Sequence, residues 1–264
     1  MALTDILKDI ANAIRAKNGE ETQYKPSEMA EAIGAIQGEA DYSSIESKLS
    51  NGHKSYGYYF AYRSFTEAPE EIMQHTGEAT NFNSMFIGCS KLTKFPTLLD
   101  TKKATDMGNM FSSCTSLAQF PETLDTANCT SFTAMFNRCY WLTVVPIMDT
   151  SKGVHFSTMF AYCSDLHTIP VIDLSSASNL STMFTDCGKL ENITFNGVIK
   201  RTGLDLSPCS KLTHDSLMSA INALYDWKSN GGTSTYKLTL GSTNLAKLTD
   251  AEKAIATEKG WTLA

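Results

Sequence analysis

An eleven-residue stretch that recurs five times along the chain decides the fold. It reads FNSMFIGCSKL at residues 82–92 and returns as MGNMFSSCTSL (107–117), FTAMFNRCYWL (132–142), FSTMFAYCSDL (156–166) and LSTMFTDCGKL (180–190). Successive copies start 25, 25, 24 and 24 residues apart. A repeat of this length is typical of an array of small structural units that stack on one another.

The Met, Phe, Cys and Leu positions are identical in all five copies. Their apolar residues follow one another at intervals of three and four, which favours one face of a short helix in each copy. A unit this short cannot bury the face alone, so neighbours must share a core, and the sequence predicts an α/β repeat solenoid resembling a leucine-rich repeat. The predicted core ladder consists of Met85, Phe86, Cys89, Leu92, Met110, Phe111, Cys114, Leu117, Met135, Phe136, Cys139, Leu142, Met159, Phe160, Cys163, Leu166, Met183, Phe184, Cys187 and Leu190.

The repeats place the limits of the solenoid at residues 41–212, with degenerate turns at both ends. A Pro follows each of the first four copies, and the copies differ in length by one residue just after it, which indicates a loop. Residues 213–264 are predicted to form a mixed α/β cap of helix, strand, helix and strand. In this cap, Thr249 and Glu252 have the spacing of a capping box at the start of the second helix.

Residues 1–40 are predicted to form a helical hairpin that attaches the protein to a partner or makes it oligomeric. A hairpin of this size seldom folds alone, so its apolar stripe needs another surface. The stripe consists of Ile6, Ile10, Ile14, Met29, Ile33 and Ile36.

Composition and charge argue against several classes of function. Lys and Arg number 22 against 28 Asp and Glu, a formal net charge of -6, so we expect no nucleic-acid partner. No apolar run is long enough to span a bilayer, and the first residues lack the pattern of a signal peptide, so we expect no membrane insertion and synthesis in a cytoplasm. Because no metal-ligand spacing and no nucleophile–base arrangement occurs, we expect no enzyme, no metal and no cofactor.

The cysteine ladder admits two interpretations. Stacked turns would bring five thiols within reach of a metal ion or of one another, but small cysteines on an apolar face are usually buried hydrophobic residues, and we favour that interpretation. Cys129 lies off the ladder and is a candidate free thiol.

One copy departs from the others at its outward positions. It carries Tyr140 and Trp141 beside Arg138, and Tyr162 follows one repeat later. Exposed aromatic and Arg residues are typical of binding hot spots and of sugar-stacking sites, so these four residues form the candidate ligand-binding site. Packing of Tyr140 and Trp141 under a loop or at a subunit contact is an equally weighted alternative. A second aromatic group, at positions 56, 58, 59 and 62, is interpreted chiefly as capping.

The motif Met-Phe-x-x-Cys-x-x-Leu, with Asp-Thr pairs such as Asp100-Thr101, resembles the leucine-rich repeats of bacterial surface proteins and of tailed-phage virion proteins. The stretch Leu3–Ile36 is similar to a module that opens many phage tail proteins, and residues 238–261 are similar to the cap of such repeat proteins. The resemblance implies a tail-associated virion protein, a homo-oligomer that contacts other virion proteins through its N-terminal module and a host surface glycan or protein through its repeats. A purely structural assembly or decoration protein and a bacterial adhesin-like repeat protein are the alternatives.

Overall fold

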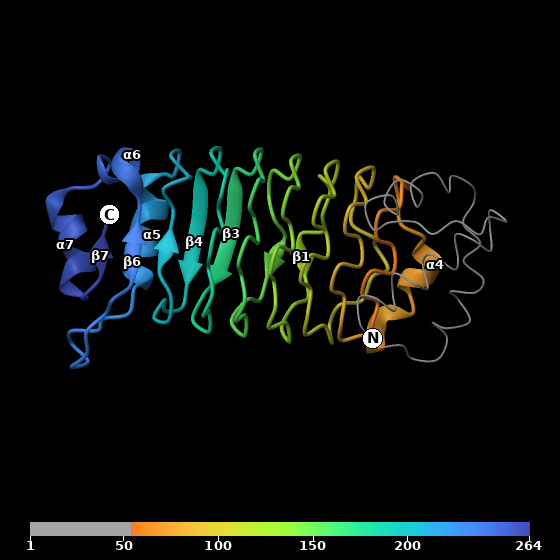
Figure 1. The fold of residues 1–264 in the computed structure, drawn as a ribbon, viewed down its shortest axis with the longest axis horizontal. Coiled ribbons are helices and arrows are strands. Elements are labelled where there is room, and N and C mark those ends of the chain that lie inside the picture. Colours follow the sequence, from red (N-terminus) through yellow and green to blue (C-terminus); the bar gives the residue numbers. More distant parts are fainter. Residues whose placement is uncertain (1–53) are drawn as a thin grey trace, which may run out of the picture.

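The repeats stack side by side along one long axis in the computed structural model, which describes residues 54–264 (Figure 1). Parallel bridges join equivalent residues of successive repeats, and we name turns 0 to 5 by the bridge residue that opens each: Ser55, Asn81, Asp106, Ser131, His155 and Asn179. The prediction that successive repeats stack on one another is therefore confirmed. The predicted hairpin at residues 1–40, with its six apolar positions, lies outside the described residues.

The prediction of a short helix in each repeat is wrong. Main-chain donors in this stretch alternate between two destinations: Met85 N–H donates to the Phe82 carbonyl three residues back, at 3.1 Å, whereas Phe86 N–H donates to the Met110 carbonyl of the next turn, at 2.9 Å. An α-helix would bond each N–H four residues back within its own segment. The stretch is instead a chain of tight turns, and every second donor links one repeat to the next.

The tight turns require left-handed backbone at two positions in each repeat, the residue before Met and the residue before Cys. Left-handed backbone costs an L-residue about 1–2 kcal/mol, because Cβ approaches the following carbonyl oxygen. Only one of these positions in turns 1 to 5 is a glycine, Gly88. The others are Ser84, Asn109, Ser113, Ala134, Arg138, Thr158, Tyr162, Thr182 and Asp186, with φ between 52° and 62°.

Stacked phenylalanines form the centre of the core. The rings of Phe86 and Phe111 lie 5.5 Å apart with an interplanar angle of 2°, and the same parallel stacking continues through Phe136, Phe160 and Phe184. All ladder positions of turns 1 to 5 are at most 2% exposed. This burial in a shared core explains why a single repeat could not be stable by itself.

Short parallel strands cover one face of the array (Figure 1). β1 (Thr123–Leu124) pairs with β2 (Ile147–Met148), and β3 (Thr168–Asp173) pairs with β4 (Asn192–Asn196). After the strands, the Thr of each Asp-Thr pair fastens one repeat to the next: the hydroxyls of Thr101, Thr126 and Thr150 donate to the Asp carbonyls of the following turn at 2.7–2.9 Å.

The two ends of the described array depart from the repeat. Turn 0 contains α4 (Glu70–Met73) and η1 (Thr76–Glu78). At the other end, β5 (Leu204–Asp205), β6 (Lys237–Thr239) and β7 (Thr262–Leu263) form a parallel sheet in that order. Three helices accompany this sheet: α5 (His214–Ala223), α6 (Gly241–Leu245) and α7 (Asp250–Glu258).

The capping box at α7 is confirmed. The Thr249 hydroxyl accepts the Glu252 N–H, and the Glu252 carboxylate accepts the Thr249 N–H at 2.8 Å. The helix α5, the strand β6, the helix α7 and the strand β7 follow one another in the predicted order. α6 was not predicted, because its five residues are too few to show a helical period.

Candidate functional site

The ladder cysteines form a column of hydrogen bonds and no disulfides. Each thiol donates to the carbonyl of the column phenylalanine one turn earlier: Cys114 Sγ lies 3.1 Å from the Phe86 oxygen, and Cys139 Sγ lies 3.2 Å from the Phe111 oxygen. The same contact recurs at Cys89, Cys163 and Cys187. The thiols thus point toward backbone oxygens of the neighbouring turn, which satisfies them without a metal or a second sulfur.

Burial makes these thiols poor nucleophiles. Desolvation raises the pKa of Cys89 and of Cys187 to about 12, and raises the pKa of Cys139 well above its ordinary value. A thiolate is the reactive form of cysteine, so a protonated, fully buried thiol is inert near neutral pH. Cys129 is also a free, buried thiol, with its pKa raised to about 12 by desolvation, and its Sγ donates to the Ser131 carbonyl at 3.2 Å.

The four residues of the candidate ligand-binding site are all exposed and lie on neighbouring turns. Tyr140 is 40% exposed, Trp141 is 65% exposed and Tyr162 is 39% exposed. The Arg138 guanidinium lies over the Tyr162 ring, 5.5 Å from its centroid. Arg138 and Tyr162 share the left-handed register before Cys, which puts them in one column and lets the cation of turn 3 reach the ring of turn 4.

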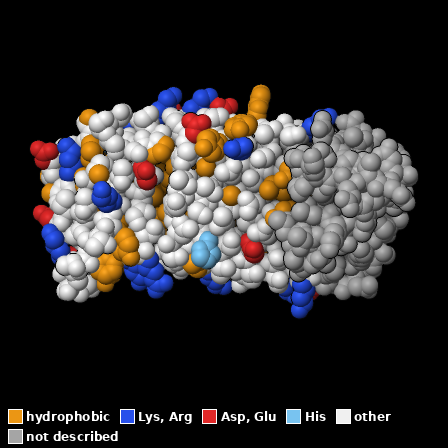
Figure 2. All heavy atoms as spheres, in the orientation of Figure 1, with side chains coloured by type: hydrophobic (Ala, Val, Ile, Leu, Met, Phe, Trp, Pro, Cys, Tyr) orange, Lys and Arg blue, Asp and Glu red, His pale blue; other side chains and the backbone are white. Residues whose placement is uncertain are grey.

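Neither Tyr140 nor Trp141 is covered by a loop of the described residues, so the alternative of packing under a neighbouring loop has no support there. The alternative of a subunit contact stays a prediction. Figure 2 shows hydrophobic side chains standing out from one long edge near the middle of the array.

Two aliphatic residues of turn 3 are exposed as well, and neither was predicted from the sequence. Val144 is 48% exposed and Ile147 is 41% exposed, and both occupy outward positions of the strand-bearing face. Val144 bridges Thr168 of turn 4, and Ile147 pairs with Thr123 of turn 2, so each position carries a polar residue in one adjacent turn. We call Tyr140, Trp141, Val144 and Ile147, with Arg138 and Tyr162, the turn-3 surface.

The second aromatic group closes the described end of the array. Tyr56 is fully buried and stacks on Phe82 of turn 1, with ring centroids 5.9 Å apart. Tyr62 is 43% exposed, and its ring covers Gly88 so closely that an added Cβ would lie 2.3 Å from it. These contacts belong to packing between turns 0 and 1.

Residues 54–264 offer neither a metal site nor a membrane-spanning helix. In that range, no three His, Cys, Asp or Glu side chains are grouped so that they could hold a metal ion. None of the helices in the same range has the length and apolar character needed to cross a bilayer.

Comparison with known proteins gives a family match and structural likenesses. A family model described as "Mycoplasma protein of unknown function, DUF285" matches residues 61–144 and 80–198, which together cover just over half of the chain. A solved structure, the T. pallidum leucine rich repeat protein, is similar at 19% sequence identity and a TM-score of 0.40, over 56% of this chain and 67% of that one. No curated protein matches.

Proposed function

This chain belongs to the DUF285 family, and we propose that it is a non-enzymatic binding protein whose leucine-rich-repeat-type solenoid displays the turn-3 surface to another macromolecule. One observation carries the proposal. Four of the eight exposed large hydrophobic residues in the described part of the chain belong to turn 3, which contributes only residues 131–154.

The composition of the turn-3 surface supports recognition. Tyr, Trp and Arg are the residue types most enriched at binding hot spots, because each combines a large apolar area with a polar group. Contiguous apolar side chains on a soluble protein also mark interaction sites, since leaving them in water is unfavourable. Fully burying the Trp141 side chain against a partner would contribute about 2–3 kcal/mol.

A protein partner fits this surface better than a glycan. Aromatic rings alone suit sugar stacking, but Val144 and Ile147 extend the surface with aliphatic groups that offer a sugar no hydrogen bonds. In the next turn, Asp165 takes the position equivalent to Trp141. Its carboxylate already forms a salt bridge with Lys189 and so is not free for a sugar hydroxyl. A surface glycan remains the second candidate ligand, supported by the exposed Tyr140 and Trp141 rings.

Two settings are proposed for such a protein. The family is described from a Mycoplasma protein, which favours the adhesin-like bacterial repeat protein over the tail-associated virion protein. The virion setting, with homo-oligomerisation and attachment through residues 1–40, rests on the resemblance of the N-terminal stretch. A purely structural assembly role would use the same solenoid without a receptor.

The proposal is tested by the binding of labelled protein to bacterial cells and to a panel of purified surface glycans. We expect Trp141→Ala to lose most of the binding, because it removes the most exposed ring of the turn-3 surface. Tyr62→Ala is the matched control, since it also removes an exposed aromatic ring but three turns away. Equal binding by wild type and Trp141→Ala, with both folded, would exclude this surface as the binding site.

A second pair of variants separates the two ligand classes. Val144→Thr and Ile147→Thr keep a β-branched side chain and β-propensity and remove apolar area. We expect them to weaken binding to a protein partner and to leave glycan binding unchanged. Loss of cell binding after protease treatment of the cells, with retention after periodate treatment, is the corresponding result on the partner's side.

A further inference from the structure

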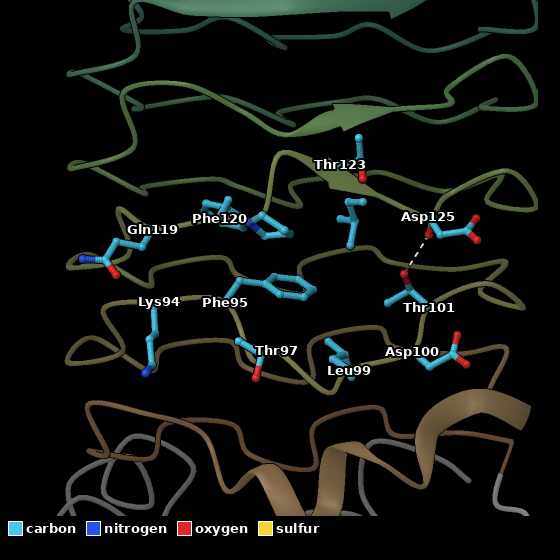
Figure 3. A pocket seen from close by; sticks show the side chains of 12 residues that line it. Lys94, Phe95, Thr97, Leu99, Asp100, Thr101, Gln119, Phe120, Thr123 and Asp125 are labelled. Atoms are coloured by element: carbon cyan, nitrogen blue, oxygen red, sulfur yellow. Dashed lines mark hydrogen bonds between the residues drawn. The ribbon is translucent and has the colours of Figure 1, made fainter.

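A hollow of about 460 Å³ opens on the strand-bearing face between turns 1 and 2. Its floor is aromatic: Phe95 and Phe120 lie one above the other, with ring centroids 5.8 Å apart (Figure 3). The Phe95 ring centroid lies 5.6 Å from that of Phe111 in the stacked core, and the Phe120 centroid lies 5.4 Å from that of Phe136. The floor is therefore apolar and fixed to the core.

The hollow exists because strand pairing is interrupted here. Lys94 bridges Gln119, but no backbone hydrogen bond joins residues 96–100 to residues 121–125, all of which the structure describes. Between turns 2 and 3 the corresponding segments pair as β1 and β2. Turns 1 and 2 are also the two repeats with an extra residue after Pro, and a Pro cannot donate to a ladder.

The two rims of the hollow differ in what their main chains offer. Ile147 N–H donates to the Glu122 carbonyl at 2.9 Å, so the alternation of a parallel strand turns the Thr123 N–H and carbonyl toward the hollow. On the opposite rim, the Thr97 and Leu98 N–H groups both donate to the Glu70 carboxylate at 2.8 Å. Thr123 thus presents a donor and an acceptor spaced for another main chain.

The charges are also uneven along the hollow. At one end, Lys94 is neutralised by Glu67 at 3.0 Å. At the other end, Asp100 is paired with Lys102 at 2.7 Å, whereas Asp125 forms no ion pair within residues 54–264 (Figure 3). An occupant would meet a carboxylate without an ion-pair partner at the Asp125 end, although Lys102 lies near enough to interact with it electrostatically.

We propose that this hollow binds an extended peptide segment of a partner protein. The segment would place an aliphatic or aromatic side chain over Phe95 and Phe120, bond its main chain to Thr123, and carry a Lys or Arg at the Asp125 end. A main-chain donor and acceptor beside an apolar floor are the features that a strand-like peptide uses. A hollow of roughly 300–1,000 Å³ holds a small ligand or a few side chains. The hollow adjoins the turn-3 surface, because Thr123 of its rim pairs with Ile147, but the proposal does not depend on the function proposed for that surface.

The test uses the full chain and four capped hexapeptides built on Thr-Val-Phe-Val-Thr. Two of them carry one added Lys, at the N-terminus in one and at the C-terminus in the other, and the other two carry Glu in place of that Lys. Binding is followed by NMR. We expect saturable shifts of the Thr123 amide and of the Leu99 and Leu124 methyl groups, with a Lys peptide binding more tightly than its Glu counterpart.

Charge reversal gives the matched comparison. Asp125→Lys should weaken binding of the Lys peptide roughly fivefold, as expected for one exposed ion pair replaced by repulsion. Asp205→Lys is the control. Both carboxylates accept the N–H of the residue two positions later, Asp125 from Ala127 at 3.4 Å and Asp205 from Ser207 at 2.9 Å, but Asp205 lies in the sheet of the C-terminal cap. The proposal is overturned if none of the peptides shifts the resonances of the hollow at about 1 mM, or if all shifts lie elsewhere. It is also overturned if monosaccharides shift these resonances and the peptides do not.

Discussion

A glycine substitution at Thr182 should stabilise the protein, although glycine is usually destabilising in regular structure. Thr182 is exposed, has φ of 52°, and its β-branched side chain makes no hydrogen bond with described residues. Left-handed backbone costs an L-residue about 1–2 kcal/mol, and the added chain entropy of glycine in the unfolded state offsets part of that gain. We therefore expect Thr182→Gly to raise the free energy of unfolding by about 1 kcal/mol.

Thr185→Gly provides the opposite sign in the same turn. Thr185 has ordinary negative φ, and its N–H donates to the Thr182 carbonyl at 3.3 Å. Without relief of strain, glycine there should lower stability by about 0.5–1 kcal/mol. Urea unfolding measures both, with midpoint shifts of about 0.3 M in opposite directions. If both variants are destabilised alike, the stretch is helical in solution and the chain-of-turns description is refuted.

Three further results are expected. Gly88→Ala should lower the free energy of unfolding by more than about 2 kcal/mol in urea, since its Cβ would meet the Tyr62 ring in left-handed backbone. Gly188→Ala is the control, because the space around Gly188 is open, and it should be nearly neutral or slightly stabilising. Equal effects of the two substitutions would contradict the contact between Gly88 and Tyr62. Desolvation raises the pKa of Cys89 from about 9 to about 12 and raises the pKa of Cys139 well above its ordinary value. The stability that such thiols contribute is therefore present below their unfolded pKa and is lost as pH rises above it, at a cost of about 1 kcal/mol for each thiol at pH 10. We expect cooperative unfolding near that pH by circular dichroism, and a native spectrum at pH 11 would refute the burial. Desolvation raises the pKa of Glu70, but hydrogen bonds from two backbone amides outweigh it and lower that pKa. The stability that the Glu70 carboxylate contributes is therefore present above pH 4.5 and is lost as pH falls. Glu70→Gln should flatten the loss of stability between pH 5 and 3, and an unchanged acid profile would exclude this contribution.

The repeat was predictable because its core registers are set by burial. A Met-Phe-x-x-Cys-x-x-Leu repeat is too short to bury its own apolar residues, so five copies must share one core with their neighbours. The structure buries every one of those positions. The capping box of α7 was predictable for a similar reason, since Thr249 and Glu252 satisfy donors of a local helix end.

The local conformation within the repeat could not be predicted from the same pattern. Apolar residues three apart occur on a helix face and also in successive tight turns, so Phe82, Met85 and Cys89 do not distinguish the two. Glycine would have marked the left-handed positions, but nine of the ten such positions in turns 1 to 5 carry side chains. Hydrogen bonding between turns, which fixes these positions, depends on partners about 25 residues away.

The candidate site was predictable only in part. Tyr140 and Trp141 stood out because other copies carry small or charged residues there. Val144 and Ile147 did not, because aliphatic residues in a strand are ordinarily buried. Only the strand register, which pairs Ile147 with Thr123, shows that they point outward.

Photo-cross-linking from position 141 tests the central claim most directly. A benzophenone amino acid is placed at Trp141 in one protein and at Tyr62 in another, and each is irradiated on bacterial cells to which it binds. We expect a discrete cross-linked protein from position 141 and none from position 62. Binding of both proteins with no cross-link from position 141, or with the same products from both positions, would contradict the assignment of the turn-3 surface as the recognition site.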